Sequence, residues 1–130
     1  MILADTSVWI DYLRGTGSPA AGAFDDRLLA HDILMCGPVA TELLTGVNAG
    51  ERARLWEAIT GLAWVDLDRA DWFLAGEVRA ELRQRGVQVA FVDALIAAAA
   101  AGRATLWTLD RDFEHIVAVL EPLEVRVFES

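Results

Sequence analysis

The stretch MILADTSVWIDYLRG, residues 1–15, decides the fold. Residues 1–4 are a short apolar run that ends at Asp5, which is typical of a strand buried in a parallel sheet. Apolar residues from Val8 to Leu13 then recur at helical spacing, and Gly15 ends that helix. A buried strand that passes directly into a helix, with an acid at the junction, favours an α/β fold.

The rest of the chain repeats this alternation. Further strands are predicted at 33–36, 63–65, 104–108 and 124–128. Helices are predicted from 18, from 37, over 55–62, from 75 to 86, over 91–101 and over 112–119. Such alternation implies right-handed crossovers and a three-layer α/β/α sandwich with a central, mainly parallel sheet. No linker or repeat divides residues 1–130, so we expect a single domain.

The segment Gly15-Thr16-Gly17-Ser18-Pro19-Ala20 matches the dinucleotide fingerprint G-x-G-x-x-A letter by letter. That fingerprint requires a strand before it and a helix after it, so that a pyrophosphate meets the helix N-terminus. Here the preceding residues are helical. We therefore interpret the segment as a helix stop, a turn and a new helix start.

The balance of charge excludes several classes of protein. The chain has 20 acidic and 11 basic residues, a net charge of −9, and every basic residue is an arginine. Receiver domains and haloacid-dehalogenase-type phosphotransferases need a lysine, so both are excluded. An acidic surface repels nucleic acid unless an arginine patch or metal ions intervene.

Cysteine content and hydropathy narrow the possibilities further. Cys36 is the only cysteine, and His31 and His115 do not stand at any zinc-site spacing, so soft-metal chemistry is not expected. The longest apolar run has eight residues, too short for a membrane span. The N-terminus does not resemble a secretion signal, and we expect a cytoplasmic protein without a membrane partner.

Four acids stand where a parallel sheet would gather them. Asp5 and Asp110 follow predicted strands, although each could simply cap a helix. Glu42 faces about 160° away from the apolar stripe of its helix, which also suits an ordinary solvated glutamate. Asp93 is the only charge between Gly86 and Gly102. Burying it unpaired would cost several kcal/mol, more than the stabilisation of about 0.3 to 1 kcal/mol from a helix N-terminus.

Together these carboxylates predict a site for a hard divalent cation. Several carboxylates close together cannot all stay ionised without a positive charge between them. Mg²⁺ and Mn²⁺ prefer carboxylate and water oxygens, and such an ion could activate water and neutralise a phosphodiester. We therefore expect Mg²⁺, with Mn²⁺ as a substitute.

Four motifs resemble the PIN-domain ribonucleases, and more narrowly the VapC toxins of type II toxin–antitoxin operons. They are DTSVWIDYLRG, ATELLTG, VDALIAAAA and LWTLDRDF, in that order along the chain. The resemblance implies that Asp5, Glu42, Asp93 and Asp110 are the metal-binding, catalytic acids. It also implies a PIN-like α/β/α fold, RNA as the substrate and a cognate VapB-type antitoxin as a partner.

Other residues receive supporting roles. By the resemblance, Thr6, Ser7 and Thr108 would be polar supports of the acids. Asp110 and Asp112 cannot share a helical face, so Asp112 is assigned to a position behind the metal ligands or to capping. Candidate RNA-binding residues are Arg14 and Arg111, with Arg83 and Arg85 as weaker ones.

The partners and the alternatives stay open at this point. The family suggests a homodimer, and one or two of the five tryptophans could anchor a dimer or an antitoxin helix. Alternatives are a non-cleaving PIN-like module that binds RNA or a partner, and a stand-alone RNA-processing nuclease without an antitoxin. A DNA-flap nuclease usually needs larger insertions and a more basic surface.

Overall fold

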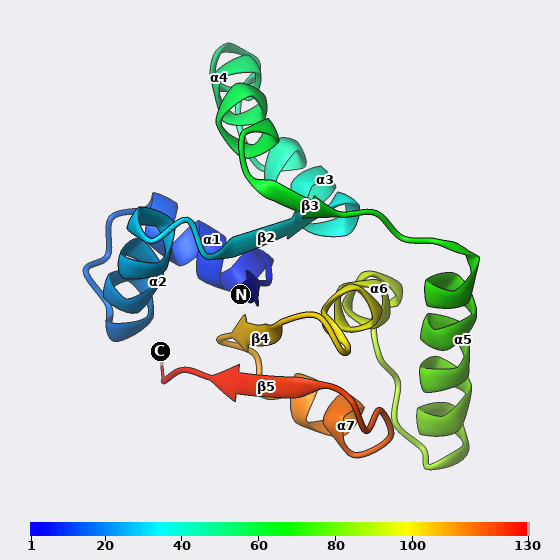
Figure 1. Cartoon of the computed structure of the whole chain (residues 1–130). Helices are drawn as coiled ribbons and strands as arrows, with labels where there is room; N and C mark the ends of the chain where they lie inside the picture. The colour runs from blue at the N-terminus through cyan, green and yellow to red at the C-terminus, as the bar shows by residue number, and fades with distance from the viewer. Residues whose placement is uncertain (130) are drawn as a thin grey trace.

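Five parallel strands form the centre of the protein in a computed structural model, which describes residues 1–129. They are β1 (Ile2–Ala4), β2 (Ile33–Cys36), β3 (Ala63–Val65), β4 (Thr105–Thr108) and β5 (Glu124–Val127). Their order across the sheet is β3-β2-β1-β4-β5, and all four pairings are parallel (Figure 1). The prediction of an α/β fold with a parallel sheet is confirmed.

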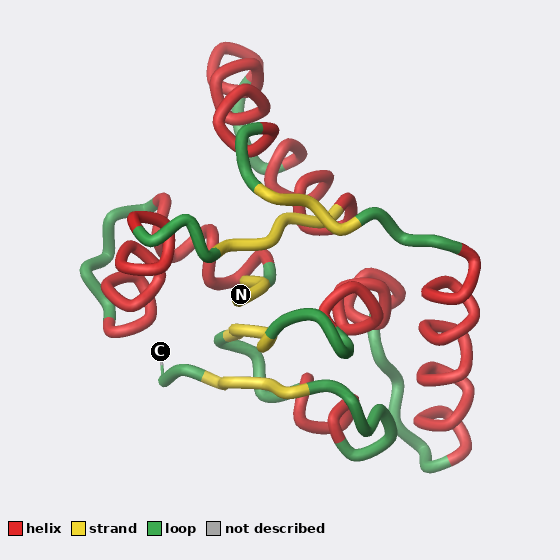
Figure 2. Tube along the Cα trace, viewed as in Figure 1, coloured by secondary structure: helices red, strands yellow, loops and turns green. Residues whose placement is uncertain are grey.

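The helices occupy the connections between these strands (Figure 2). They are α1 (Thr6–Leu13), α2 (Pro19–Leu29), α3 (Gly37–Thr45), α4 (Ala49–Thr60), α5 (Arg69–Gln84), α6 (Phe91–Ala100) and α7 (Phe113–Val117). Right-handed crossovers place α1 to α4 on one face of the sheet and α5 to α7 on the other. Of the helices in residues 1–129, none is both long and apolar enough to cross a membrane.

The chain reverses its direction across the sheet beside β1. From β1 it moves outward through β2 to β3, and it then returns to add β4 and β5 on the other side of β1. The register aligns Ala4 of β1 with Trp107 of β4. In open α/β sheets ligands bind beyond the carboxyl ends of the strands at such a reversal, so a site is expected after β1 and β4.

The turn between α1 and α2 has the form expected from its sequence. Gly15 and Gly17 both take positive φ angles, of 66° and 67°, which L side chains rarely adopt. The Ser18 hydroxyl accepts a hydrogen bond from the Ala21 amide at 3.0 Å, and Pro19 opens the helix. The interpretation as a helix stop, a turn and a helix start is confirmed.

Three predicted helices have different bounds in the structure. The helix predicted from 75 to 86 is α5, which begins at Arg69 and ends at Gln84. The helix predicted over 55–62 is α4, which begins at Ala49 behind an Asn48 cap and ends at Thr60, so Leu62 lies outside it. The helix predicted over 112–119 is only α7, residues 113–117. The first residues of α4 are polar, and the spacing of apolar residues indicates only the buried face of a helix. The beginning of α4 could therefore not be predicted from that spacing.

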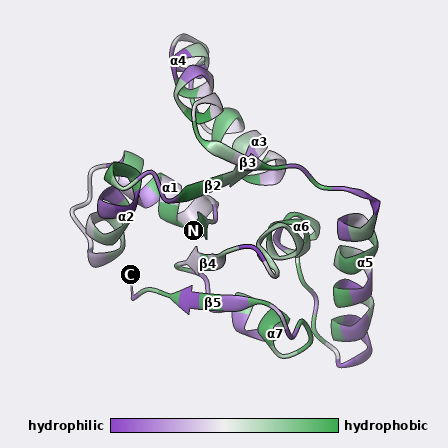
Figure 3. Ribbon diagram, viewed as in Figure 1, coloured by the Kyte–Doolittle hydropathy of each residue, from purple (hydrophilic) through white to green (hydrophobic). Residues whose placement is uncertain are grey.

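The core lies between the sheet and both helix layers. All residues of β1 are buried, and so are the residues of α6 from Ala94 to Ala100. The helix α5, in contrast, alternates hydrophobic and hydrophilic turns, and it buries only one stripe, which includes Ala75, Val78 and Leu82 (Figure 3). The outer face of α5 is therefore free to present polar and aromatic side chains.

Candidate active site

Asp5 stands at the end of β1, where its carboxylate caps α1 and is 4% exposed. Its Oδ1 accepts hydrogen bonds from the Val8 amide at 3.2 Å and from the Ser7 hydroxyl at 2.5 Å. Burial raises the pKa of Asp5, and the hydrogen bonds oppose that rise. The capping alternative is therefore real, but capping uses only one of the two carboxylate oxygens.

Thr108 joins the ends of β1 and β4. Its fully buried hydroxyl donates to the other oxygen of Asp5, Oδ2, at 2.5 Å and accepts from the Asp110 amide at 2.9 Å. Ser7 makes a second connection, because its hydroxyl accepts from the Leu109 amide at 3.0 Å while it donates to Asp5. Two hydroxyls thus hold Asp5 beside the segment that carries Asp110.

Glu42 reaches this region from α3. Its side chain is exposed, as expected for a residue opposite the apolar stripe, whereas Leu43 beside it is buried. The Glu42 Oε1 accepts a hydrogen bond from the Thr6 hydroxyl at 2.5 Å. Because Thr6 follows Asp5 directly, this bond brings the third acid to the end of β1.

Asp93 is half-buried in the first turn of α6. Its pKa is raised to about 6, chiefly by burial and further by the negative charges of Asp110, Asp5, Glu42 and Asp112. No ion pair within residues 1–129 involves Asp93. The negative charges of the other three predicted acids, and of Asp112, thus all act on the Asp93 carboxyl.

Asp112 occupies the position before α7, but its side chain makes no capping hydrogen bond. Its amide instead donates to Asp110 Oδ1 at 2.9 Å, which fixes the Asp110 carboxylate in a tight turn. Asp112 is exposed and close enough to affect Asp93 electrostatically. Asp112 is thus the N-cap residue of α7, but its carboxylate does not cap the helix; its place behind the metal ligands stays a prediction.

The two arginines predicted to bind RNA differ in their surroundings. Arg111 pairs with Glu114 at 3.2 Å and with Glu129 at 2.8 Å, so its guanidinium is already opposed by two carboxylates. Arg14 caps the C-terminus of α1, is exposed and forms no ion pair with any residue from 1 to 129. Of the two, Arg14 is the one whose charge is available to a phosphate.

The donor set fits a hard cation, although no finished cage is present. Within residues 1–129, no three histidine, cysteine, aspartate or glutamate side chains stand in an arrangement that could by itself hold a metal ion. Mg²⁺ is usually held by one or two carboxylates and keeps several of its waters, so it does not need a cage made only of protein. The mutual repulsion that acts on Asp93 is the charge pattern that such an ion would relieve.

A further acid, Asp66, was missed by the sequence reasoning. It follows β3 directly, so a census of acids after strands could have found it. Asp66 and Glu42 line a cavity of about 480 Å³ whose other walls include Trp72 and Val92. The cavity therefore lies against the acidic site, on the side of α3 and α6.

These features define a class: an α/β domain with a hydroxyl-supported acidic site at the reversal point of a parallel sheet. The chain belongs to the PIN-domain family, whose model matches residues 2–119. The resemblance inferred from the four motifs is thereby confirmed.

Comparison with relatives narrows the resemblance to VapC. The chain is 36% identical over 126 residues to the VapC ribonuclease Mb1587 of Mycobacterium bovis and to Ribonuclease VapC11 of Mycobacterium tuberculosis. Each match covers 92% of this chain and 93% of the relative. Ribonuclease VapC32 of Mycobacterium tuberculosis is 33% identical over 111 residues, covering 85% of this chain and 86% of the relative.

Solved structures share the fold over nearly the whole chain. A structure of VapBC2 from Rickettsia felis bound to a promoter DNA fragment matches with a TM-score of 0.77 and 23% identity, covering 99% of this chain and 100% of that chain. FitAB bound to an IR36 DNA fragment matches with a TM-score of 0.78 and 23% identity, covering 98% and 94%. These likenesses support the fold at low sequence identity.

Proposed function

We propose that the protein is a metal-dependent endoribonuclease and the toxin of a VapBC-type toxin–antitoxin pair. Relatives named VapC ribonucleases that align with nine-tenths of the chain support the reaction. The observation that carries the proposal is the Thr108 hydroxyl, which bridges Asp5 and the Asp110 amide at the reversal point of the sheet.

Mg²⁺, or Mn²⁺ in its place, would be held chiefly by Asp5 and Asp93, with Glu42 and Asp110 as direct or water-mediated partners. When bound, such an ion activates water as a nucleophile and neutralises charge on the phosphodiester. The chemistry of the donor set supports this choice, because every candidate ligand is a carboxylate oxygen.

The protein's own groups orient the acids. Ser7 and Thr108 donate to the two oxygens of Asp5, which fixes its carboxylate and opposes the rise in pKa that burial causes. Thr6 holds Glu42. Burial and the neighbouring carboxylates raise the pKa of Asp93 to about 6, and an ion bound beside it would favour its charged form.

The biological setting follows from the same proposal. The structural neighbours include VapBC complexes from Rickettsia felis and Salmonella typhimurium, which supports a VapB-type antitoxin as a partner of this chain. A toxin that acts on cellular RNA works in the cytoplasm. A homodimer remains part of the proposal, to be tested by light scattering.

The test is cleavage of a labelled single-stranded RNA while Mn²⁺ or Mg²⁺ is titrated. We expect cleavage that needs the ion, stops on addition of a chelator and falls at least about 100-fold in an Asp93→Asn variant prepared identically. Unchanged circular dichroism would show that the variant is folded. Full activity of the variant, or cleavage insensitive to chelator, would overturn the proposal. RNA binding without cleavage by the unsubstituted protein would favour the non-cleaving module.

A further inference from the structure

We propose that the side of α5 beside residues 87–91 is a track for single-stranded RNA, with Trp72, Arg79 and Arg83 as its contact residues. The inference rests on the proposed function and names surface that the acidic site does not use. Three features support the inference: a stripe of side chains on one helix, a groove beside that stripe, and an aromatic pair that connects the groove with the acids.

The stripe follows from helical geometry. Positions 72, 76, 79 and 83 are spaced i, i+4, i+7 and i+11, so they lie within about 30° of one line along α5. The line is about 16 Å long at 1.5 Å per residue. Trp72, Arg79 and Arg83 are exposed, and a side chain added at Gly76 would meet no atom within 4 Å. The stripe is therefore open along its length.

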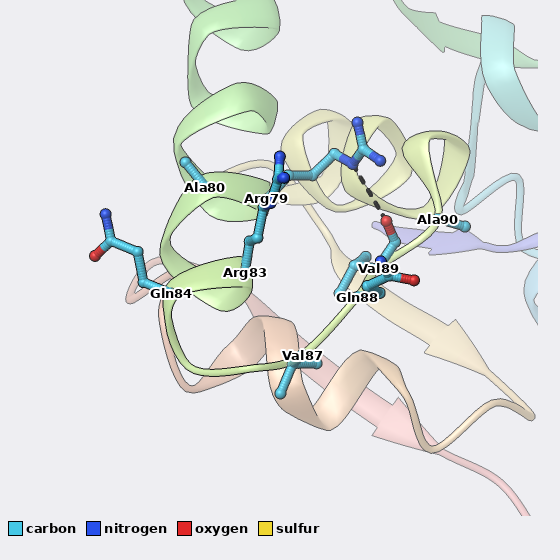
Figure 4. Close-up of a pocket in the computed structure, with 8 residues that line it drawn as sticks. All are labelled: Arg79, Ala80, Arg83, Gln84, Val87, Gln88, Val89 and Ala90. Atoms are coloured by element: carbon cyan, nitrogen blue, oxygen red, sulfur yellow. Dashed lines mark hydrogen bonds between the residues drawn. The ribbon is translucent and has the colours of Figure 1, made fainter.

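A groove of about 1080 Å³ lies beside the C-terminal half of this stripe. It runs between α5 and the segment 87–90 that leads into α6 (Figure 4). The Arg79 Nε donates to the Val89 carbonyl at 3.2 Å, which holds the guanidinium over the groove. Arg83 forms no ion pair or side-chain hydrogen bond within residues 1–129. Gln84 and Gln88 complete the polar wall.

The charge of this groove is opposite to that of the protein. The whole chain carries −9, yet the groove is lined by two arginines and no acid. Arg85, a few residues away, is neutralised by Glu81 at 3.0 Å, whereas neither groove arginine faces a carboxylate in the described part of the chain. Two uncompensated guanidinium groups fit the phosphates of a polyanion.

Aromatic rings continue the track toward the acids. The Arg79 guanidinium carbon lies 5.7 Å from the ring centre of Phe91, and the Phe91 ring centre lies 6.4 Å from that of Trp72. Both rings are about half exposed, 54% for Phe91 and 50% for Trp72. Rings of this kind offer stacking faces to bases, and the combination with arginine is typical of single-strand binding.

The track ends at the acidic site. Trp72 lines the 480 Å³ cavity together with Glu42, and Val92, next to Asp93, forms another wall. That volume lies within the range of small-ligand pockets. A base held against Trp72 would thus lie beside the carboxylates, and the following phosphates would run along Arg79 and Arg83. Duplex RNA offers no unstacked base, so a single strand fits this order of groups.

The experiment measures binding of a labelled single-stranded RNA by anisotropy in the Asp93→Asn background, which prevents cleavage. Trp72→Leu and the double change Arg79→Gln, Arg83→Gln are compared with matched controls on α4. These controls are Trp56→Leu, at a tryptophan 47% exposed, and Arg54→Gln, at an exposed arginine.

We expect Trp72→Leu to weaken binding about tenfold or more, since one stacked base contributes that much. The double arginine variant should lower the slope of log K against log salt by about 1.4, because each phosphate contact contributes about 0.7 on a single strand. Both controls should bind as the parent does.

Other results would overturn the inference. RNA affinity and salt slope equal to those of the controls would exclude the track, even if the unsubstituted protein still cleaves RNA. A change from dimer to monomer in the double arginine variant, measured by light scattering, would show instead that the face is an interface between copies. The proposed function fails separately, through absence of ion-dependent cleavage by the unsubstituted protein.

Discussion

Replacing Asp93 with asparagine should make the metal-free protein more stable at pH 8 but not at pH 4. The pKa of Asp93 is raised from 3.8 to about 6 by burial and by neighbouring carboxylates. Its contribution to stability is therefore fully present below about pH 3.8 and is lost as the pH rises through 6, where the folded protein must ionise it. Asparagine has nearly the same side-chain shape as aspartate but does not ionise, so the variant avoids the free-energy cost of ionisation at high pH.

The size of the effect follows from the same shift. Each tenfold change in the acid dissociation constant corresponds to about 1.4 kcal/mol, so a rise from 3.8 to about 6 corresponds to at most about 3 kcal/mol. Solvent reaches this half-buried carboxyl and screens the charges, which reduces the expected gain at pH 8 to about 1 to 2 kcal/mol. Near pH 4 the two proteins should be equally stable.

The assay is urea unfolding followed by tryptophan fluorescence in the presence of a chelator, at pH 4, 6 and 8. Asp26→Asn, at an exposed aspartate of α2, is the matched control, and it should change stability by less than about 0.5 kcal/mol at every pH. A stability gain that does not depend on pH, or a loss at pH 8, would refute the reasoning. The pKa of Asp93 would then not be raised by burial and by the neighbouring acids.

Three further predictions concern the groups that hold the site and the fold. Thr108→Val should lower the free energy of unfolding in urea by about 1 to 3 kcal/mol, because buried Asp5 loses a hydrogen-bond donor. Equal stability of the two proteins would show that the hydroxyl is dispensable. Asp71→Ala should lower the free energy of unfolding by about 2 to 4 kcal/mol in the same assay, because Asp71, which is 6% exposed, pairs with Arg103 and completes a capping box. A loss under about 0.5 kcal/mol would contradict this. Burial raises the pKa of the Cys36 thiol to about 11, so native protein should react with a thiol reagent only as fast as it unfolds, and rapid reaction would be inconsistent with the packing.

The exposure of the tryptophans could be anticipated only as a group. Five were too many for a core of this size, and Trp56 and Trp72 are indeed about half exposed while Trp9 and Trp107 are buried. Composition limits how many large side chains fit inside, but the position of each depends on which helix face meets the sheet. The sequence therefore could not predict that Trp72 lines the cavity.

The partners of the charged side chains could not be predicted from the sequence either. Arg111 stands beside Asp110 in the sequence and suggested a phosphate ligand, but in the fold it meets Glu114 and Glu129. Glu129 follows β5, which pairs with β4, and only that pairing brings it near Arg111. No sequence pattern, in contrast, marked Arg79 as a binding residue. Its position over the groove is fixed by the hydrogen bond from its Nε to the Val89 carbonyl.

Local patterns in the sequence determined the elements and the acids. Apolar runs ended by Asp5 or followed by Gly37 mark strand ends, and periodicity marks helices, since these signals arise between residues a few positions apart. The assembly of the site was decided only by tertiary structure. Strands β1 and β4, whose sequences lie about 100 residues apart, pair in a register that sets the Thr108 hydroxyl on Asp5, and chain order contains no information about that register.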